Sequence, residues 1–366
     1  MMLSSIQIKK FRCFNSLQVN GFKSINLIGG QNNSGKTALL EALLLSFFPS
    51  TASISVLRQF RNENDKLIKT ATDKVWNYFF YNQEKEHVIE FISVFQDGDI
   101  RNLELSCTRD IESVLESIST SIGNGKERIS DLISSKFSNT LLLNVKGRLF
   151  KDDFNYFLLP DKEDSDIGAI GKTPPNFEMP PFLHSSFRLS DNELSSLFSK
   201  AKEQKKLSKL NDILSLLDNR IIGSEIDAPG GEPVIKLILN DEQSFPLGMF
   251  GDAIRKITEL ILVILNTSNS IILIDEIENG IHYTKHKNLW EKLFQIVDND
   301  IQIFATSHSA EMIRAFNEVA SSPELESKAM YFEMGRTVNS NKIIINPMDM
   351  NTLNAEIITN NSYRGE

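Results

Sequence analysis

The chain contains little cysteine and no long hydrophobic run. Its 366 residues include two cysteines, which are too few for a disulfide framework or a four-ligand zinc site and suit a reducing compartment. The longest purely apolar run, residues 260–265, is far shorter than the roughly 20 residues that span a bilayer. Residues 1–14 carry basic side chains without an apolar core, so they predict neither a signal peptide nor an anchor. We therefore expect a cytoplasmic protein with no membrane partner.

The chain also lacks a positive charge balance. Lysine and arginine number 39 against 48 aspartates and glutamates, a formal net charge of −9 at pH 7. The field of the whole chain repels nucleic acid, so DNA binding would need a local basic patch. Five lysines without interleaved aromatic residues form one candidate, for DNA phosphates or an acidic partner, although a solvated helix turn is the plainer interpretation. They are Lys200, Lys202, Lys205, Lys206 and Lys209.

Alternating strand and helix patterns predict an α/β protein. Residues 25–28 form an expected strand that leads through glycines into a helix over residues 36–48. Residues 88–105 alternate in polarity around Asp97-Gly98, which predicts an antiparallel hairpin. An expected helix over 254–265 and strands over 271–274 and 301–305 then predict a parallel sheet.

Composition divides the chain into four predicted segments. Residues 151–182 are rich in acidic residues and proline, which predicts an exposed loop between two lobes. Ser190 and Glu193 have the spacing of a capping box, and two short helices follow. No heptad pattern is sustained, so no long coiled coil is expected. The segments are a first lobe over 1–150, the loop over 151–182, a short helical arm over 183–235 and a second lobe over 236–366.

A phosphate-binding loop is predicted between the strand at 25–28 and its helix. The sequence GQNNSGKT fits G-x4-G-K-[ST], and its backbone N–H groups and the helix N-terminus favour a polyphosphate. Lys36 is expected to reach the β- and γ-phosphates of ATP, and Thr37 to ligate magnesium. A glycine-rich turn is the alternative, but the flanking strand and helix favour nucleotide. The predicted binding residues are Gly30, Gln31, Asn32, Asn33, Ser34, Gly35, Lys36 and Thr37.

Acidic residues follow the predicted strand at 271–274. Asp275 is expected to hold magnesium with Thr37, and Glu276 to act as general base for the attacking water. Glu278 is expected to stay solvated. The next strand ends at Thr306-Ser307-His308-Ser309, which places His308 to contact the γ-phosphate, although a histidine at a strand end is more often structural.

The order of these blocks resembles that of ABC-class ATPases of the SMC/RecF-like branch. The likeness is strongest to the ATPase module of the OLD (overcoming lysogenization defect) nuclease family and its stand-alone relatives. It is carried by residues 8–14 (IKKFRCF), GQNNSGKT, residues 275–282 (DEIENGIH) and residues 305–309 (ATSHS), whereas residues 50–240 match only in general layout. The resemblance implies a D-loop at 279–282, a switch role for His308, and a homodimer, or a higher homo-oligomer, that encloses two ATP molecules between paired subunits.

The resemblance also implies a signature segment that binds the γ-phosphate of the opposite subunit. Residues 246–255 lie where it is expected, but they depart from the pattern. Relatives usually offer serine where Gly248 or Met249 stands, and glycine at Ala253. The backbone N–H groups from Gly248 to Gly251 could still bind phosphate, but the missing hydroxyl predicts slow turnover. The family's glutamine loop is not placed, with Gln59, Gln83 and Gln96 as candidates.

These features predict a magnesium-dependent ATPase. The resemblance implies that it acts as a nucleotide switch on a separate effector, a nuclease or toxin, in bacterial defence against phage. The alternative is a RecF-like DNA-binding repair ATPase, which the similar length and the lack of long arms favour, while the DEIENGIH block and the acidic charge do not. A transporter subunit is disfavoured because LSGGQ is absent, and GTP because NKxD is absent. About twenty residues follow position 345, too few for the Toprim nuclease domain of OLD proteins, so the effector is expected in trans.

Overall fold

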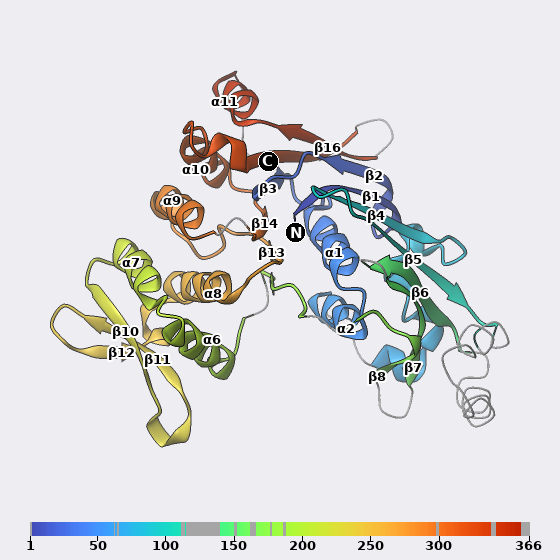
Figure 1. The fold of residues 1–366 in the computed structure, drawn as a ribbon, viewed down its shortest axis with the longest axis horizontal. Coiled ribbons are helices and arrows are strands. Elements are labelled where there is room, and N and C mark those ends of the chain that lie inside the picture. The colour runs from blue at the N-terminus through green and yellow to red at the C-terminus, as the bar shows by residue number, and fades with distance from the viewer. Residues whose placement is uncertain are drawn as a thin grey trace.

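Strands of the described residues form three sheets (Figure 1). The computed structural model describes residues 2–61, 63, 66–110, 114, 140–149, 152–161, 166–175, 178–185, 188–297, 300–337 and 342–359. A parallel sheet, an antiparallel sheet and covering helices together confirm the predicted mixed α/β fold. None of the described helices is long and apolar enough to cross a membrane.

The central sheet contains the strand that precedes the phosphate-binding loop. Its order is β16 (Ile343–Met348), β15 (Ala329–Arg336), β3 (Ile25–Gly30), β14 (Gln302–Thr306), β13 (Ile271–Ile274) and β9 (Phe182–Leu183). The strands from β15 to β9 pair in parallel, and β16 is antiparallel to β15. All residues of β3, β13 and β14 are buried, as expected for strands covered on both faces. Their carboxyl ends share one edge of the sheet.

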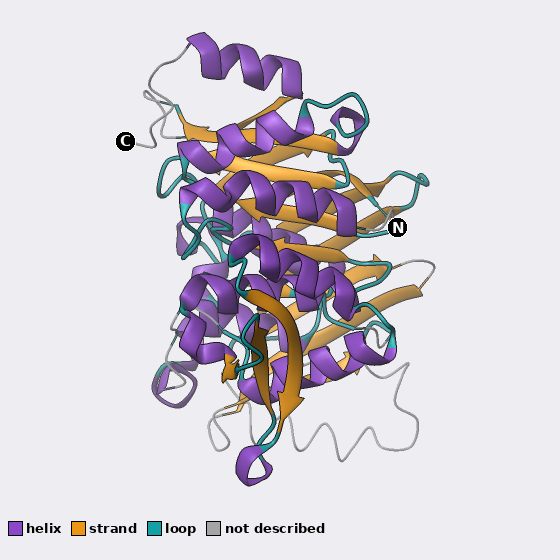
Figure 2. Cartoon of the chain, turned by 90° about the vertical axis from the view of Figure 1, so that its left-hand side faces the viewer, coloured by secondary structure: helices purple, strands orange, loops and turns teal. Residues whose placement is uncertain are grey.

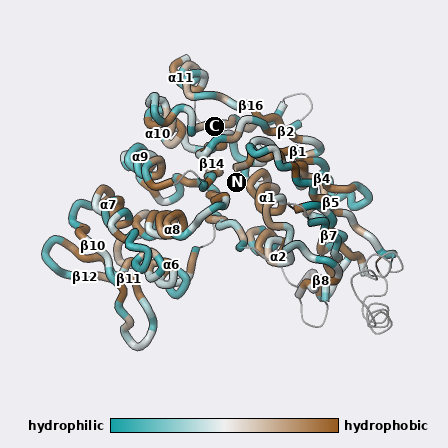
Figure 3. The backbone as a smooth tube through the Cα atoms, in the orientation of Figure 1, coloured by the Kyte–Doolittle hydropathy of each residue, from teal (hydrophilic) through white to brown (hydrophobic). Residues whose placement is uncertain are grey.

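Alternate residues of β13 enter two different cores. Ile271 and Leu273 join the core that contains α1 (Lys36–Phe47), whereas Ile272 and Ile274 face α8 (Asp252–Asn266), α9 (His286–Ile296) and α10 (Ala310–Ala320). Figure 2 shows the helices stacked across the strands, and Figure 3 shows how apolar α8 is. The central sheet is therefore covered by helices on both faces.

Seven antiparallel strands form the second sheet, on the far side of α1. Their order is β2 (Phe14–Asn20), β1 (Leu3–Phe11), β4 (Ile89–Phe95), β5 (Ile100–Thr108), β6 (Leu142–Leu149), β7 (Asp152–Asp161) and β8 (Asp166–Lys172). The turn at Asp97-Gly98 joins β4 to β5, which confirms the predicted hairpin. Helices α2 (Thr51–Phe60) and α3 (Lys66–Thr70) follow α1 along the chain.

The prediction of an exposed loop over residues 151–182 was wrong. Strands β7 and β8 occupy much of that range, and β7 buries Phe154, Tyr156 and Leu158 in the core around α1. Asp152, Asp161 and Asp166 stand at strand ends, so the acidic composition marks turns and not a long loop. Glu163 and Asp164 lie outside the described residues.

The predicted helical arm is a helix pair that packs on the rest of the protein. The capping box of Ser190 and Glu193 starts α6 (Asp191–Glu203), and α7 (Leu207–Leu217) follows. Phe198 of α6 and Leu210 of α7 share a core with Ile261 of α8. The small sheet of β10 (Ile221–Asp227), β11 (Val234–Leu239) and β12 (Ser244–Pro246) extends from this helix pair (Figure 1). Helix α11 (Met350–Thr359) closes the described chain.

Candidate nucleotide-binding site

The predicted phosphate-binding loop joins β3 to α1 at the carboxyl edge of the central sheet. Gly30 has a φ of 135°, and a Cβ atom there would lie 2.1 Å from the carbonyl oxygen of Met334, so this position requires glycine. Lys36 is buried, and its Nζ donates to the carbonyl oxygens of Gly30 at 2.6 Å and Gln31 at 2.9 Å. Burial lowers the pKa of Lys36, and the nearby carboxylates of Asp275, Glu278 and Glu276 oppose that shift. The loop thus holds a cation at its centre.

Asp275 lies opposite Thr37, as the sequence predicts. The Thr37 hydroxyl is 3.1 Å and 3.2 Å from the two carboxylate oxygens, and the Thr306 hydroxyl donates to Oδ1 at 2.7 Å. Hydroxyl and carboxylate oxygens suit a hard divalent cation, so this donor set fits magnesium. Within the described ranges no group of three or more His, Cys, Asp or Glu side chains is arranged to hold a metal. Phosphate and water oxygens would therefore supply most of the shell of an ion here.

Glu276 stands in a fixed, sterically unusual turn. Its backbone φ is 51°, a value that residues other than glycine rarely adopt. The backbone N–H of Glu276 donates to the Thr306 hydroxyl at 2.8 Å, and Lys256 Nζ donates to its carbonyl oxygen at 2.8 Å. These two contacts hold the turn that directs the Glu276 side chain into the pocket beside Asp275.

Glu278 is buried, so the prediction that it stays solvated was wrong. It is 9% exposed, because the turn after Glu276 folds it back under the loop that follows β14. Its Oε1 accepts from the backbone N–H of His308 at 2.8 Å and lies 3.0 Å from the ring Nδ1. The His308 side chain is 44% exposed and does not line the pocket within this chain. Glu278 therefore ties His308 to the turn that carries Glu276.

A pocket of about 850 Å³ contains the phosphate-binding loop, Asp275 and Glu276. Other lining residues come from the β1–β2 turn, the end of α2 and the chain before β4. Apart from Gln83, the sequence does not predict them as site residues. Of the three glutamines considered for the glutamine loop, Gln83 lines this pocket, whereas Gln59 and Gln96 are exposed elsewhere. The added lining residues are Arg12, Cys13, Arg61, Glu63, Tyr78, Phe80, Asn82 and Gln83. Aromatic and amide groups there suit a base and ribose.

A buried carboxylate of α1 holds two arginines at this pocket. Glu41 is fully buried, with its oxygens 2.9 Å from Arg12 Nε and 2.7 Å from Arg61 Nε. The Arg12 guanidinium also lies 4.6 Å from the ring centroid of Phe79. Because Glu41 follows the phosphate-binding loop by one helical turn, the same helix orders both the loop and the arginines.

His184 is a further neighbour of Asp275 without a signal in the sequence, and it is not among the residues that line the nucleotide pocket. It follows β9 directly, and its Nε2 lies 3.7 Å from Asp275 Oδ2. The ring stacks on Phe60 with a centroid distance of 4.4 Å. Burial lowers the pKa of His184, against the opposing effect of Asp275. A two-residue strand shows no periodicity, so the sequence does not place His184 next to Asp275.

The predicted signature segment does not reach the pocket of its own chain. Gly248 lies in a 3₁₀ turn, Leu247–Phe250, and Gly251 precedes α8 with a φ of 82°. No described atom lies within 4 Å of a Cβ built at either glycine. Met249 is 73% exposed. The structure thus brings the loop, Asp275 and Glu276 together and leaves Gly248 and Gly251 on the surface.

Comparison with known families identifies the chain. A family described as "AAA domain, putative AbiEii toxin, Type IV TA system" matches residues 25–314. The chain belongs to this family. The matched range includes the phosphate-binding loop, the Asp275-Glu276 turn and His308, so the family segments are those that the structure gathers at the carboxyl edge of the sheet. Family membership confirms the predicted ATPase activity.

Several relatives cover different parts of the chain. An "ATP/GTP phosphatase" of Helicobacter pylori is 25% identical over 342 residues, which are 87% of this chain and 88% of the relative. The DNA replication and repair protein RecF of Oenococcus oeni is 40% identical over 74 residues, 20% of this chain and 18% of RecF. A solved SmcHead bound to the C-winged helix domain of ScpA covers 95% of the chain at 8% identity, with a TM-score of 0.46. The family match and the RecF segment confirm an ABC-class, SMC/RecF-like P-loop ATPase.

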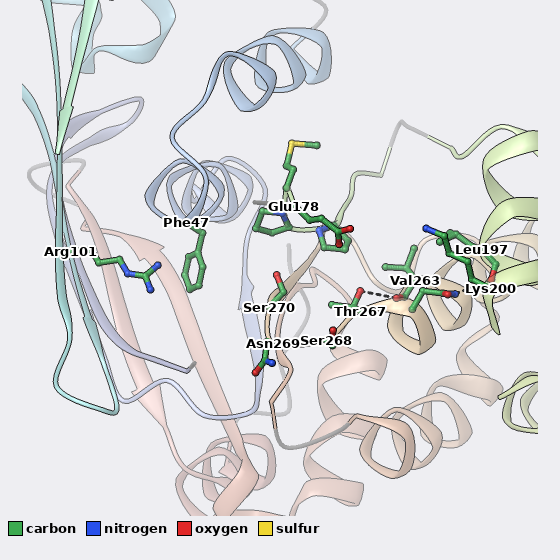
Figure 4. Close-up of a pocket in the computed structure, with 14 residues that line it drawn as sticks. Phe47, Arg101, Glu178, Leu197, Lys200, Val263, Thr267, Ser268, Asn269 and Ser270 are labelled. Atoms are coloured by element: carbon green, nitrogen blue, oxygen red, sulfur yellow. Dashed lines mark hydrogen bonds between the residues drawn. The ribbon is translucent and has the colours of Figure 1, made fainter. Parts of the chain in front are cut away.

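A second pocket, of about 600 Å³, lies at the opposite end of β13 (Figure 4). Phe47 and Arg101 stand on one side, Leu197 and Lys200 on the other, with residues 267–270 between them. Ser270 precedes β13, whereas Asp275 follows it. The length of the strand therefore separates this pocket from the phosphate-binding loop, and its residues do not contribute to the nucleotide site of this family member.

Proposed function

We propose that this chain is a magnesium-dependent ATPase whose nucleotide state switches a separate effector. The observation that carries the proposal is the convergence of Lys36, Thr37, Asp275 and Glu276 on one pocket from two separate segments. Thr37 and Asp275 would hold the magnesium ion, which, when bound, would stabilise negative charge on the β- and γ-phosphates.

Lys36 and Glu276 of this chain have separate roles in the remaining steps of hydrolysis. The Lys36 ammonium leaves the carbonyl oxygens of Gly30 and Gln31 and binds the β- and γ-phosphates. The Glu276 carboxylate takes a proton from the attacking water as its oxygen bonds to the γ-phosphorus. The bond from that phosphorus to the bridging oxygen breaks, which releases ADP and phosphate. Because the Glu276 backbone is held on both sides, its carboxylate meets the water with little reorganisation.

The proposed assembly is a homodimer that encloses two ATP molecules. The D-loop glycine, Gly280, lies against the start of α8, since its Cβ position is 3.9 Å from Ala253 N. The D-loop and the signature-like segment therefore form one continuous surface. Met249 is 73% and Tyr283 62% exposed on that surface, and apolar side chains exposed together favour an interface. Gly248 and Gly251 would then offer backbone N–H groups to the partner's γ-phosphate.

The proposed effector is a separate nuclease or toxin, and the setting is defence against phage, as in stand-alone relatives of OLD nucleases. Support comes from the description of the family, which names a putative AbiEii toxin and a type IV TA system. ATP can control such a partner only if the two nucleotide states bind it with different free energies. The test is copurification with the products of adjacent genes, in which the amount of partner retained must differ between wild type with ATP and Lys36→Ala.

RecF-like DNA binding is the second candidate, because the RecF segment is 40% identical. In the lysine cluster, Lys206 Nζ donates to the carbonyl oxygen of Leu265 and so links the start of α7 to α8, whereas the other four lysines are exposed. Tight, ATP-dependent binding of duplex DNA at physiological salt, without a partner protein, would favour this candidate. Hydrolysis should be measured with both ATP and GTP, since the Helicobacter pylori relative is named for both.

A further inference from the structure

We propose that His184 supplies a nitrogen ligand to the divalent ion at the nucleotide site, so that the site binds Mn²⁺ more tightly relative to Mg²⁺ than an all-oxygen site would. This inference rests on the proposed function and deepens it, since it concerns the same ion that Thr37 and Asp275 would hold.

The backbone fixes His184 beside Asp275. Strand β9 pairs in parallel with β13, with Phe182 opposite Leu273 and Leu183 opposite Ile274. The next residues on the two strands are His184 and Asp275, and the Asp275 N–H donates to the Leu183 carbonyl oxygen at 2.9 Å. Both side chains therefore leave the sheet at the same edge, next to the phosphate-binding loop.

Packing fixes the ring as well. His184 stacks on Phe60, with an angle of 10° between the rings, and Phe182 meets it at 66° with centroids 6.0 Å apart. The side chain is 9% exposed. Two aromatic neighbours on separate segments leave the imidazole little freedom, so the direction of Nε2 towards Asp275 is set before any ligand binds.

The distances suit two ligands of one ion. Nε2 lies 3.7 Å from Asp275 Oδ2, too far for a hydrogen bond. Two ligands at about 2.1 Å from one octahedral ion stand roughly 3 to 4 Å apart. Asp275 Oδ1 accepts from Thr306, and the Thr37 hydroxyl lies 3.1 Å from Oδ1 and 3.2 Å from Oδ2. Asp275 thus has two neighbours with a potential metal donor, Thr37 and His184.

The chemistry of the donor predicts the selectivity. Magnesium prefers oxygen ligands and accepts imidazole poorly, whereas Mn²⁺ and the later divalent metals accept nitrogen. A single imidazole in an otherwise oxygen shell would therefore leave magnesium binding intact and strengthen manganese binding.

Electron spin-echo measurements on Mn²⁺ bound with β,γ-methylene-ATP test the ligand directly, because this analogue has no nitrogen near the metal. The wild-type protein should show modulation from a directly bound ¹⁴N nucleus. His184→Phe, which keeps the stack on Phe60, should lose it, and His308→Gln and His87→Gln should keep it. Modulation that survives in His184→Phe, or that disappears in His308→Gln, would overturn the assignment.

Competition between the two metals gives a second readout. His184→Phe should lower the ratio of Mn²⁺ to Mg²⁺ affinity about tenfold, with an unchanged melting temperature to show that the fold is intact. An unchanged ratio in a folded variant contradicts the proposal. If wild type binds Mn²⁺ with the analogue but shows no nitrogen coupling, the His184 ligand alone is wrong. If wild type binds neither, the nucleotide site itself is wrong and the inference fails with it.

Discussion

His308 and Glu278 are joined twice. The backbone N–H of His308 donates to Glu278 Oε1 at 2.8 Å, and the ring Nδ1 lies 3.0 Å from the same oxygen. The second oxygen of Glu278 is buried and has no hydrogen-bond partner among the described residues. Glu278 follows Glu276 by two residues, so one short turn carries both the proposed base and the group that orients the proposed γ-phosphate sensor.

Glu278→Gln should slow hydrolysis without preventing ATP binding. The amide oxygen can still accept from the His308 N–H, but the charge that orients the imidazole is gone. We expect turnover to fall about tenfold and ATP affinity to stay within about twofold, measured by phosphate release and calorimetry. Glu324→Gln, an exposed acidic residue, is the control. Equal turnover in the two variants would contradict the proposed role of the Glu278–His308 pair in hydrolysis.

Glu41→Gln should destabilise the protein, because it removes the closer of two described carboxylates from the largely buried Arg12 and leaves Glu63 at 3.8 Å. Breaking a buried ion pair by removing one partner costs about 3 kcal/mol or more. Glu90→Gln is the matched control, since its pair with Lys9 is exposed and worth less than about 1 kcal/mol. Urea unfolding of both variants measures the difference, and equal free energies of unfolding would contradict the structural role of Glu41.

Local chemistry explains which parts of this fold the sequence predicts. The loop from Gly30 to Thr37 is recognisable because glycines, a lysine and a threonine must occupy fixed positions around a phosphate. The hairpin at Asp97-Gly98 is recognisable because its turn residues and its alternating strands agree. In both places one short segment of sequence is enough to predict the local structure.

Long-range pairing explains what the sequence leaves out. His184 reaches Asp275 through a strand of two residues, and Glu41 of α1 meets Arg12 of the distant β1–β2 turn. No spacing rule connects such positions. Composition gave a wrong prediction for residues 151–182. Acidic residues stand at the ends of β7 and β8 and are typical of a loop, although β7 between its acidic ends is largely apolar.

Gly30→Ala should disrupt the phosphate-binding loop and destabilise the protein. The new Cβ would approach the Met334 carbonyl to 2.1 Å at a backbone φ that alanine avoids. We expect a loss of roughly 3 kcal/mol or more in the free energy of unfolding, together with loss of ATP binding. Gly335→Ala is the control, because no described atom lies within 4 Å of its Cβ position. Thermal unfolding of both variants provides the test, and similar melting temperatures would refute this reading of the loop.

Lys36→Ala should abolish ATP binding. Lys36 is the cation held at the centre of the loop, where its two carbonyl contacts can be exchanged for phosphate oxygens. We expect the dissociation constant for a non-hydrolysable ATP analogue to rise at least about a hundredfold in calorimetry. Lys328→Ala, an exposed lysine, should bind as wild type does. Unchanged affinity of Lys36→Ala for the analogue would contradict the assignment of this loop as the phosphate-binding loop.

Glu276→Gln should bind ATP but hydrolyse it about a hundredfold to ten-thousandfold more slowly, because the amide keeps the shape of the side chain and cannot accept the proton of the water. ATP then persists at the site, and the proposed dimer should accumulate, with light scattering showing twice the monomer mass in ATP and magnesium. Lys36→Ala under the same conditions should keep the mass of the nucleotide-free protein. The signature-like segment offers backbone N–H groups but no serine hydroxyl, so wild-type turnover should itself be slow. If Glu276→Gln retains normal turnover, the general base is another group. If the variant is inactive but stays monomeric with bound ATP, the proposed ATP-enclosing dimer is wrong, and the exposed surface around Met249 and Tyr283 serves another partner.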